Sequence, residues 1–276
     1  MPGGEPAGPR RAVSTDGTQI AYWTSGAGPA LVLVHGTTAD HTRWLPLLPH
    51  LEPHVTVHAL DRRGRGASGD GADHSWEREA QDVAAVVAAV ADRTGSQVDV
   101  YGHSYGGLCA FGAAALSDRV RRLVLYEGWP AVDPVAFALP AGFLEHLEAL
   151  LAAGSREAVV ETVFRDLVGM PDAELEAVRS LPSWQARIAA AHTVPRELRV
   201  YERAVLDPVQ AARISAPVLL LTGADSQDPS AGDVELVARA LADARVAVLD
   251  GQQHVADLLA PEEFTRHVLD FLHGSS

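Results

Sequence analysis

Ser104 is the residue whose type and setting most clearly predict chemistry. It stands in the pattern G-x-S-x-G, between Gly102 and Gly106. The apolar run 98–101 precedes the pattern and the small-residue run 108–116 follows it, which is the order strand, turn, helix. Such a turn strains the serine and exposes its oxygen above the helix N-terminus, where partial positive charge favours an oxyanion. The pattern predicts nucleophilic catalysis by Ser104; an ordinary glycine-rich turn is the simpler alternative.

A nucleophilic serine needs a general base, and His254 is the histidine, among 12 in the chain, whose position fits this role. It follows the last predicted strand, 245–249. A loop that leaves the carboxyl end of a parallel strand carries its side chains to the same edge of the sheet as the turn at Ser104. We therefore expect His254 to accept the proton of Ser104.

Three carboxylates are candidates for the group that orients this histidine. Asp225 follows the predicted strand 217–222, and Asp228 lies in the same loop. Glu127 directly follows the predicted strand 122–126. Either loop could place a carboxylate against an imidazole nitrogen, so the choice stays open, with Asp225 taken first. In the alternative roles Asp225 caps a turn, and Glu127 anchors the cap by an ion pair or forms a polar wall.

The oxyanion that forms during the attack needs two N–H donors. One is predicted to be the backbone N–H of Tyr105, and the other that of Thr37, in the loop after the apolar strand 30–35. Four neighbouring residues are predicted to line a substrate pocket: His35, Gly36, Trp44 and Trp129. Arg43, beside Trp44, is predicted to be solvated, although it could face a substrate carboxylate.

Alternating strands and helices must position these residues. Apolar runs predict strands at 18–24, 30–35, 54–60, 98–101, 122–126, 217–222 and 245–249. Helical patterns predict helices at 44–51, 77–93, 234–241 and 261–272, the second of them after a capping Ser75. The alternation predicts an α/β fold, with a mostly parallel, doubly wound sheet flanked by helices on both faces.

One long segment interrupts this alternation, because it carries no strand signal. Helical patterns occur there at 142–153, 156–168, 173–179, 184–191 and 196–205. The chain is therefore predicted to consist of a loose N-terminal tail at 1–11, a core made of 12–129 and 209–276, and an inserted helical cap at 130–208. A cap at this point would lie over the carboxyl ends of the strands, where open α/β sheets bind ligands.

Composition limits the classes of function. The chain has 276 residues, of which 47% are hydrophobic, enough for one large domain. Its net charge of −14 argues against a nucleic-acid partner and would repel strongly anionic substrates at long range. Because no apolar run is long enough to span a bilayer, no membrane partner is expected. A single cysteine, Cys109, rules out an internal disulfide and favours the cytoplasm.

Other patterns are weaker and are interpreted structurally. The chain contains no lysine, which excludes a Ser–Lys dyad and a lysine Schiff base. The run 64–69 matches G-x-G-x-x-G, but a loop follows it where a dinucleotide site requires a helix. His50, His54 and His58 are spaced by four, yet Pro53 breaks any helix that would align them as metal ligands. We therefore expect neither cofactor nor metal.

Four motifs together resemble the α/β-hydrolase superfamily, in its branch of small, capped bacterial serine hydrolases. These motifs, in the family's order and spacing, are HG at 35–36, DRRGRGAS at 61–68, the turn at 102–106 and GQQH at 251–254. The resemblance implies the α/β-hydrolase fold, with Ser104 as nucleophile and His254 as base. One position departs from it: where many relatives carry the acid in the loop after the predicted strand 217–222, this chain has Ser226.

The sequence thus predicts a serine hydrolase that cleaves a carboxylic ester or lactone of a small, moderately apolar molecule through an acyl-enzyme. A hydrolase of C–C bonds with the same triad is the enzymatic alternative. A non-hydrolytic ligand-binding or tailoring protein on this fold is the alternative from another class. The sequence does not indicate the oligomeric state.

Overall fold

An eight-stranded sheet forms the centre of the protein in a computed structural model that describes residues 8–133, 138–227 and 230–274. The strand order is β1-β2-β4-β3-β5-β6-β7-β8. β1 and β2 are antiparallel to their neighbours, and β4 to β8 form, with β3, a parallel sheet. The predicted mostly parallel, doubly wound sheet is confirmed.

The strands match the apolar runs of the sequence closely. They are β1 (Arg10–Val13), β2 (Gln19–Gly26), β3 (Ala30–Val34), β4 (Thr56–Leu60), β5 (Val98–His103), β6 (Val120–Tyr126), β7 (Val218–Gly223) and β8 (Ala244–Leu249). Every residue of β3, β5 and β7 is buried. Strands covered on both faces need such continuous apolar stretches, which explains why the sequence signal was strong.

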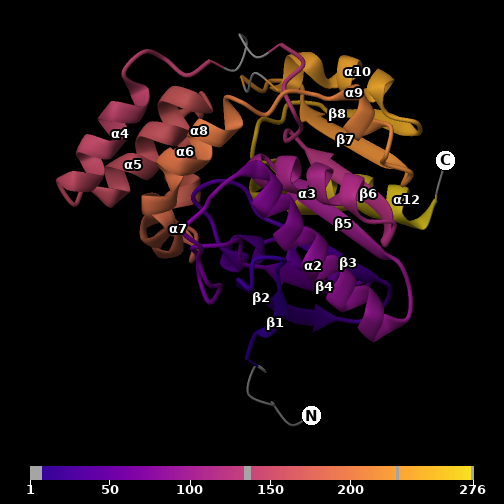
Figure 1. Cartoon of the computed structure of the whole chain (residues 1–276). Coiled ribbons are helices and arrows are strands. Elements are labelled where there is room, and N and C mark those ends of the chain that lie inside the picture. Colours follow the sequence, from indigo (N-terminus) through magenta and orange to yellow (C-terminus); the bar gives the residue numbers. More distant parts are fainter. Residues whose placement is uncertain (1–7, 134–137, 228–229, 275–276) are drawn as a thin grey trace.

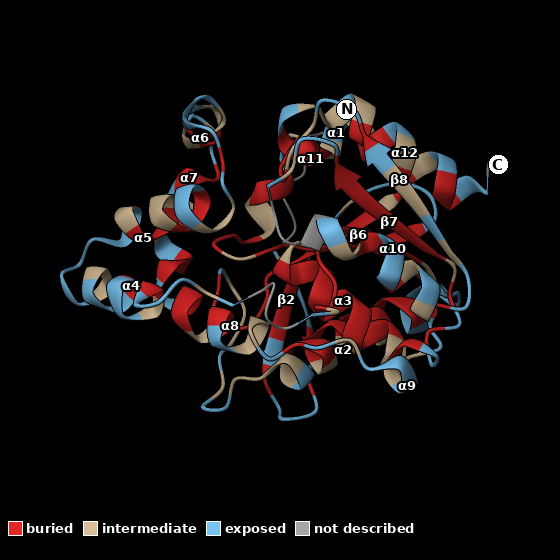
Figure 2. Ribbon diagram, turned by 90° about the horizontal axis from the view of Figure 1, so that it is seen from above, coloured by how far each residue is buried: buried red, intermediate tan, exposed pale blue. Residues whose placement is uncertain are grey.

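Helices cover both faces of the sheet (Figure 1). One apolar cluster joins the sheet to α2 (Trp76–Thr94), α3 (Tyr105–Leu116) and α10 (Ser230–Ala240). A second cluster joins the opposite face to α1 (Leu48–Leu51) and α12 (Pro261–His273). Figure 2 shows the consequence, with buried strands at the centre and exposed residues on the outer faces of the helices. The core therefore consists of two layers, one on each side of the strands.

Two local expectations were wrong. β1 takes Arg10 and Arg11 from the predicted loose tail, because this strand pairs with β2 from Arg10 to Val13. The tail's residues 1–7 lie outside the described residues. In place of one helix at 44–51, a 3₁₀ turn, η1 (His41–Trp44), is followed by α1. Asp40 caps the turn by accepting a hydrogen bond from the backbone N–H of Thr42, so the helical region starts earlier than its apolar pattern indicated.

The segment between β6 and β7 is helical, as predicted. It contains α4 (Phe143–Ala152), α5 (Arg156–Thr162), the π-helical turn η2 (Val163–Leu167), α6 (Asp172–Arg179), α7 (Trp184–Ala190), the 3₁₀ turn η3 (Ala191–Thr193), α8 (Val194–Tyr201) and α9 (Pro208–Ala211). Helices α4 to α8 form a separate lobe beside the sheet (Figure 1) with an apolar cluster of their own. At its base, Ala131 and Val205 form a β-bridge, so the lobe leaves and rejoins the core at one place. We call this lobe the cap.

Buried ion pairs join the cap to the core. Glu197, on α8, binds the guanidinium of Arg62 at 2.7 Å and also pairs with Arg65. Both arginines lie in the loop after β4, and Arg62 also pairs with Glu79 of α2 at 3.0 Å. All four side chains are buried. The predicted structural role of the loop 61–68 thus includes holding the cap, and the segment 69–75 that follows forms no helix.

Replacing Glu197 by glutamine is expected to destabilise the protein by about 3 kcal/mol or more, because it leaves the buried guanidinium of Arg65 without its counter-charge and Arg62 with Glu79 alone. Glu148→Gln is a matched control in the same cap, since Glu148 pairs with Arg199 where both side chains are about half exposed. That exposed pair is expected to contribute less than about 1 kcal/mol. Urea unfolding of the two variants measures the difference, and equal losses would contradict the anchoring role of Glu197.

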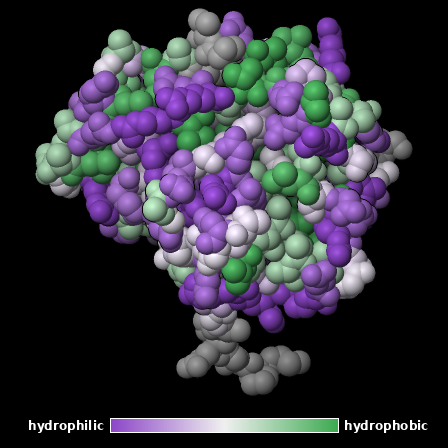
Figure 3. Space-filling view, viewed as in Figure 1, coloured by the Kyte–Doolittle hydropathy of each residue, from purple (hydrophilic) through white to green (hydrophobic). Residues whose placement is uncertain are grey.

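Within the described residues, no helix combines the length and apolarity that crossing a bilayer requires. Large exposed hydrophobic side chains, such as Val13 and Val209, come from separate elements. Figure 3 shows that hydrophobic areas on the face viewed are broken up by hydrophilic residues.

Candidate active site

Ser104 occupies a strained turn between β5 and α3. Its backbone angles are φ 54° and ψ −132°, a conformation that non-glycine residues rarely adopt. The turn is held from the neighbouring strand, because the backbone N–H of Ser104 donates to the carbonyl oxygen of Tyr126 at 2.9 Å. The side chain is partly exposed directly before the N-terminus of α3. This is the geometry that the G-x-S-x-G pattern predicts.

Close backbone contacts explain the two glycines of the pattern. A Cβ atom on Gly106 would lie 2.3 Å from the carbonyl oxygens of Val34 and His35. A Cβ atom on Gly102 would lie 2.7 Å from the carbonyl oxygen of Gly106. Since real Cβ atoms do not approach backbone oxygens so closely, any larger residue would push α3 away from the sheet. The two glycines therefore let the helix hold the serine in place.

His254 and Glu127 form a buried hydrogen-bonded pair. Nδ1 of His254, in the loop between β8 and α11 (Ala256–Leu259), lies 2.6 Å from Oε2 of Glu127, which follows β6. An ionised carboxylate only accepts hydrogen bonds, so Nδ1 carries the proton and Nε2 is left as the basic nitrogen. This is the tautomer that a general base for a serine requires.

The surroundings of Glu127 favour the ionised carboxylate. Oε1 accepts hydrogen bonds from the backbone N–H of Gly223 at 2.8 Å and the hydroxyl of Thr222 at 3.1 Å. Oε2 accepts one from the hydroxyl of Ser226 at 2.8 Å. Burial raises the pKa of Glu127, but these bonds and the contact with His254 outweigh it and hold the pKa below its ordinary value.

The structure does not place Asp225, the first choice for the acid, against the histidine. Asp225 is exposed, and no hydrogen bond among the described residues joins its carboxylate to His254. The loop that carries it has a different task, since its Gly223 and Ser226 donate hydrogen bonds to Glu127. Asp228 lies outside the described residues.

Backbone strain is concentrated around this site. Among the residues that the structure describes, Thr38, Ser104 and Glu127 are the non-glycine residues with positive φ, at 57°, 54° and 43°. Thr37 and Tyr105, the two predicted oxyanion donors, line the same cavity as Ser104. As the first residue of α3, Tyr105 has a backbone N–H without an acceptor inside the helix. Strain maintained at three loops that meet in one place is typical of a functional site.

A cavity between the core and the cap gives access to Ser104 and His254. The core contributes Thr37, Thr38, Arg43, His103, Ser104, Tyr105, His254 and Val255. The segments that follow β6 contribute Ala138, Leu139, Val163, Phe164, Leu167, Val168, Arg187, Leu198 and Tyr201. Its volume is about 80 Å³, several times the space that one water needs. The cavity therefore admits a small group of atoms next to the serine, beneath a largely apolar cap.

The four predicted pocket residues do not line this cavity. Trp44 and Trp129 are fully buried in the two clusters that pack against opposite faces of the sheet, so they serve the core. His35 and Gly36 brace the turn below the cavity. The imidazole of His35 lies 2.9 Å from the carbonyl oxygen of Gly36 and accepts a hydrogen bond from the backbone N–H of Arg62 at 3.1 Å. The pocket assignment of these four residues was wrong.

Arg43, which the sequence analysis placed in solvent, is buried and supports the base. Its Nη2 binds Asp257 at 2.6 Å, and its Nη1 donates to Nδ1 of His103. Nε2 of His103 in turn donates to the backbone carbonyl of His254 at 2.8 Å. Burial keeps the pKa of His103 well below its ordinary value, so the ring stays neutral and can accept at one nitrogen while donating at the other. The chain of contacts holds the loop of His254.

Arg187, on α7 of the cap, is a second buried arginine at the cavity that sequence reasoning missed. A signal was present: Arg187 lies three residues after Trp184, on the same face of an amphipathic helix. That face is buried, whereas arginines in helices normally occupy the solvated face. The cap-derived apolar residues Phe164, Leu167 and Leu198 also line the cavity, and their roles depend on how the cap lies against the core.

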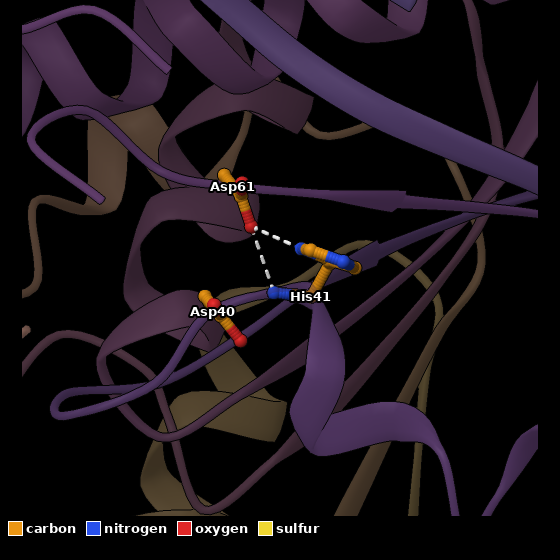
Figure 4. A group of neighbouring side chains, drawn as sticks. All are labelled: Asp40, His41 and Asp61. Carbon is orange, nitrogen blue, oxygen red and sulfur yellow. Dashed lines mark hydrogen bonds and ion pairs between the residues drawn. The ribbon is translucent and has the colours of Figure 1, made fainter. Parts of the chain in front are cut away.

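Among the described residues, two clusters of histidine and carboxylate side chains have ligand atoms close enough for a metal ion, and both are explained by internal contacts. In Figure 4, one oxygen of Asp61 accepts from the backbone N–H and the Nδ1 of His41, both at 2.8 Å. The other oxygen of Asp61 accepts from the backbone of Ala67, and Asp40 caps η1. In the second cluster, His74, Glu79 and Glu197, the carboxylates face the arginines described above.

Comparisons with known proteins identify the family of the chain. A sequence model of the alpha/beta hydrolase family matches residues 31–267. The chain is 29% identical to 2-(acetamidomethylene)succinate hydrolase of Mesorhizobium japonicum, over 90% of this chain and 89% of that protein. It is 28% identical to pimeloyl-(acyl-carrier protein) methyl ester esterase of Photobacterium profundum, over 92% and 99% of the two chains.

Solved structures show the same arrangement of elements. The crystal structure of an alpha/beta hydrolase from Sphaerobacter thermophilus is similar with a TM-score of 0.80 and 33% identity, over 95% of this chain and 100% of that one. An esterase from a Rhodococcus species is similar with a TM-score of 0.70 and 26% identity, over 98% and 100% of the chains.

Proposed function

Because the chain belongs to the alpha/beta hydrolase family, we propose that it is a serine hydrolase of carboxylic esters or lactones. The observation that carries this proposal is the meeting of three distant segments. A strained Ser104 and a His254 that is buried against Glu127 line one cavity beneath the cap. If these residues had only a structural role, in an ion pair or in core packing, the fold would not need a strained and partly exposed serine at this place.

In the proposed reaction, Oγ of Ser104 attacks the carbonyl carbon while Nε2 of His254 takes the hydroxyl proton. Glu127 stabilises the imidazolium that forms, and the backbone N–H groups of Tyr105 and Thr37 stabilise the oxyanion. The bond between the carbonyl carbon and the leaving oxygen then breaks, and His254 protonates that oxygen. A water molecule, deprotonated by His254, attacks the acyl-enzyme and releases the acid and the free serine.

The cavity supports a small and partly apolar substrate. Its lining is rich in aliphatic side chains, which suits the apolar part of such a substrate. Relatives named as an ester hydrolase and as a hydrolase of a substituted succinate agree in the reaction class, hydrolysis, and differ in their substrates. A small-molecule partner and action in the cytoplasm remain proposals that rest on the cavity and on the single, buried Cys109.

Labelling with a fluorophosphonate tests the proposed nucleophile. We expect stoichiometric modification of Ser104, identified by peptide mapping, because only a serine activated by a neighbouring base attacks this phosphorus centre rapidly. Heat-unfolded protein is the control and should not react. A native protein that is not modified, or that is modified at another serine, would reject the proposal and leave a non-hydrolytic binding role as the better explanation.

The C–C bond hydrolase alternative employs the same three side chains, so labelling does not separate it from an esterase. Product analysis does: an esterase releases an alcohol and an acid, whereas a C–C hydrolase of a dicarbonyl compound adds water across the broken bond and releases an acid and a ketone or aldehyde. The small aliphatic lining favours the ester or lactone as the first substrate class to assay.

A further inference from the structure

Arg187 carries a buried positive charge at the cavity without a carboxylate partner. It is 2% exposed and extends from α7 of the cap. Within the described residues it forms no ion pair, and its one hydrogen bond is a long one, from Nη1 to the carbonyl oxygen of Thr38 at 3.4 Å. Its Nε–H is buried without any acceptor. The guanidinium also lies over the ring of Phe164, 5.3 Å from the ring centre, a contact that stabilises the charge without neutralising it. Burying a charge without a carboxylate in contact is costly, so an arginine at this place calls for an explanation.

Arg43, the other arginine at the cavity, also has a buried Nε without an acceptor, but its charge is paired. Its charge is matched by Asp257 at 2.6 Å, and Asp257 also accepts a hydrogen bond from the hydroxyl of Tyr101 at 2.9 Å. Arg187 feels the charges of Asp257 and Asp40 at a distance, but among the described residues no carboxylate binds it directly. Arg43 is thus an arginine that stabilises the fold. Arg187, in contrast, is placed to bind a carboxylate that does not belong to the described part of the chain.

The charges of the cavity lining also favour a negatively charged ligand. No aspartate or glutamate is among the described residues that line it, whereas two arginines are. Burial and the nearby Arg43 lower the pKa of Arg187 to about 9, so the guanidinium still carries its proton at neutral pH. The cavity is therefore locally positive although the chain as a whole has a net charge of −14. Salt screens the long-range repulsion but not a contact inside the cavity.

We propose that Arg187 binds a carboxylate group of the substrate, and that the substrate is an ester or lactone which carries a second, ionised carboxyl group. This inference rests on the proposed function for the reacting ester. The planar guanidinium forms two parallel hydrogen bonds with a carboxylate, which matches both its charge and its free donors. The methylene groups between the carboxylate and the ester would lie against Phe164 and Leu167. The cap thereby selects anionic esters over neutral ones.

Two pairs of esters test this selection, one for each half of the substrate. On the acyl side, mono-(para-nitrophenyl) glutarate is compared with para-nitrophenyl pentanoate. On the alcohol side, para-acetoxybenzoate is compared with para-tolyl acetate. Within each pair a carboxylate replaces a methyl group and the rest is unchanged. The measured quantity is the ratio of kcat/KM for the anionic member to kcat/KM for the neutral member.

We expect wild-type protein to prefer the anionic member of at least one pair, and Arg187→Gln to lower that ratio by about 10- to 100-fold. Arg187→Lys should restore part of the ratio, because it returns the charge without the two-pronged geometry. Arg156→Gln, which removes an exposed arginine of the same cap, is the matched control and should leave the ratio unchanged. A ratio that Arg187→Gln does not alter in either pair would overturn the inference.

Binding of glutarate, measured by calorimetry, keeps the test independent of turnover. We expect wild type to bind glutarate at least about tenfold more tightly than Arg187→Gln does, and more tightly than it binds neutral glutaramide. If no ester is hydrolysed but glutarate binding depends on Arg187, the proposed function fails and the anion site stands. Equal glutarate affinities in the two proteins, or no binding by either, would reject the anion site. Because the substitution leaves no buried carboxylate without its ion-pair partner, we expect Arg187→Gln to fold, and Arg187→Met is the substitute.

Discussion

Replacing Ser104 by alanine is expected to lower kcat for ester hydrolysis by about 10⁴-fold or more, because it removes the proposed nucleophile. His254 and the two oxyanion N–H groups would remain, and they sustain only the slow direct attack by water. The measurement is steady-state hydrolysis of para-nitrophenyl acetate with protein purified free of host esterases.

Ser96→Ala is the control for this variant. Ser96 is exposed just before the start of β5, whereas Ser104 follows its end, so both substitutions remove one hydroxyl close to the same strand. We expect Ser96→Ala to keep wild-type kcat. Both variants should retain the wild-type thermal transition, since neither hydroxyl forms a described buried hydrogen bond. An active Ser104→Ala protein would place the chemistry at a different residue.

Replacing Glu127 by glutamine should lower kcat by about 10³- to 10⁴-fold, whereas Asp225→Asn should change it by less than about twofold. Glutamine has nearly the same shape, but its amide cannot stabilise an imidazolium and can present a donor where His254 needs an acceptor. The hydrogen bonds from Gly223, Thr222 and Ser226 are built for a carboxylate. Asp225 is exposed, so its amide would change only the surface.

Stability must be measured beside activity, because Glu127 is buried. Glu127→Gln is expected to lose some free energy of unfolding, about 1–3 kcal/mol, as its hydrogen bonds weaken. The loss of kcat should greatly exceed what that change explains at a temperature where the variant is fully folded. Since the pKa of Glu127 lies below its ordinary value, the deficit should be the same throughout the neutral range of pH. Similar small losses in the Glu127 and Asp225 variants would mean that neither carboxylate orients His254.

The choice of the acid shows where sequence reasoning reached its limit. Glu127 and Asp225 both follow parallel strands, and β6 and β7 are neighbours, so both loops emerge at the same edge of the sheet. The positions of the two residues along the chain predict that both lie at this edge, but not which of the two side chains points toward His254. The inward turn of Glu127 depends on its unusual φ of 43° and on donors from the other loop. Contacts between two loops have no counterpart in the local pattern of either one.

The same limit explains the errors on the pocket. Trp44 and Trp129 are large and lie near the predicted site in sequence, but in the fold their side chains fill the two apolar layers that cover the sheet. Arg43 looked like a surface residue because its partners, His103 and Asp257, are far away along the chain. Whether such a side chain meets solvent, a cavity or a buried carboxylate depends on elements that only folding brings together.

Some features of this protein follow from the sequence alone. Continuous apolar runs specify buried parallel strands, because such strands are covered on both faces. The glycines at 102 and 106 and the serine between them specify the turn, because only hydrogen side chains allow so close an approach of helix and strand. Two features depend on the tertiary structure: which carboxylate faces His254, and the position of Arg187, a residue of the cap, in the wall of the cavity. These contacts join residues 60 to more than 200 positions apart, and the free energy of burying them is determined by the assembled fold.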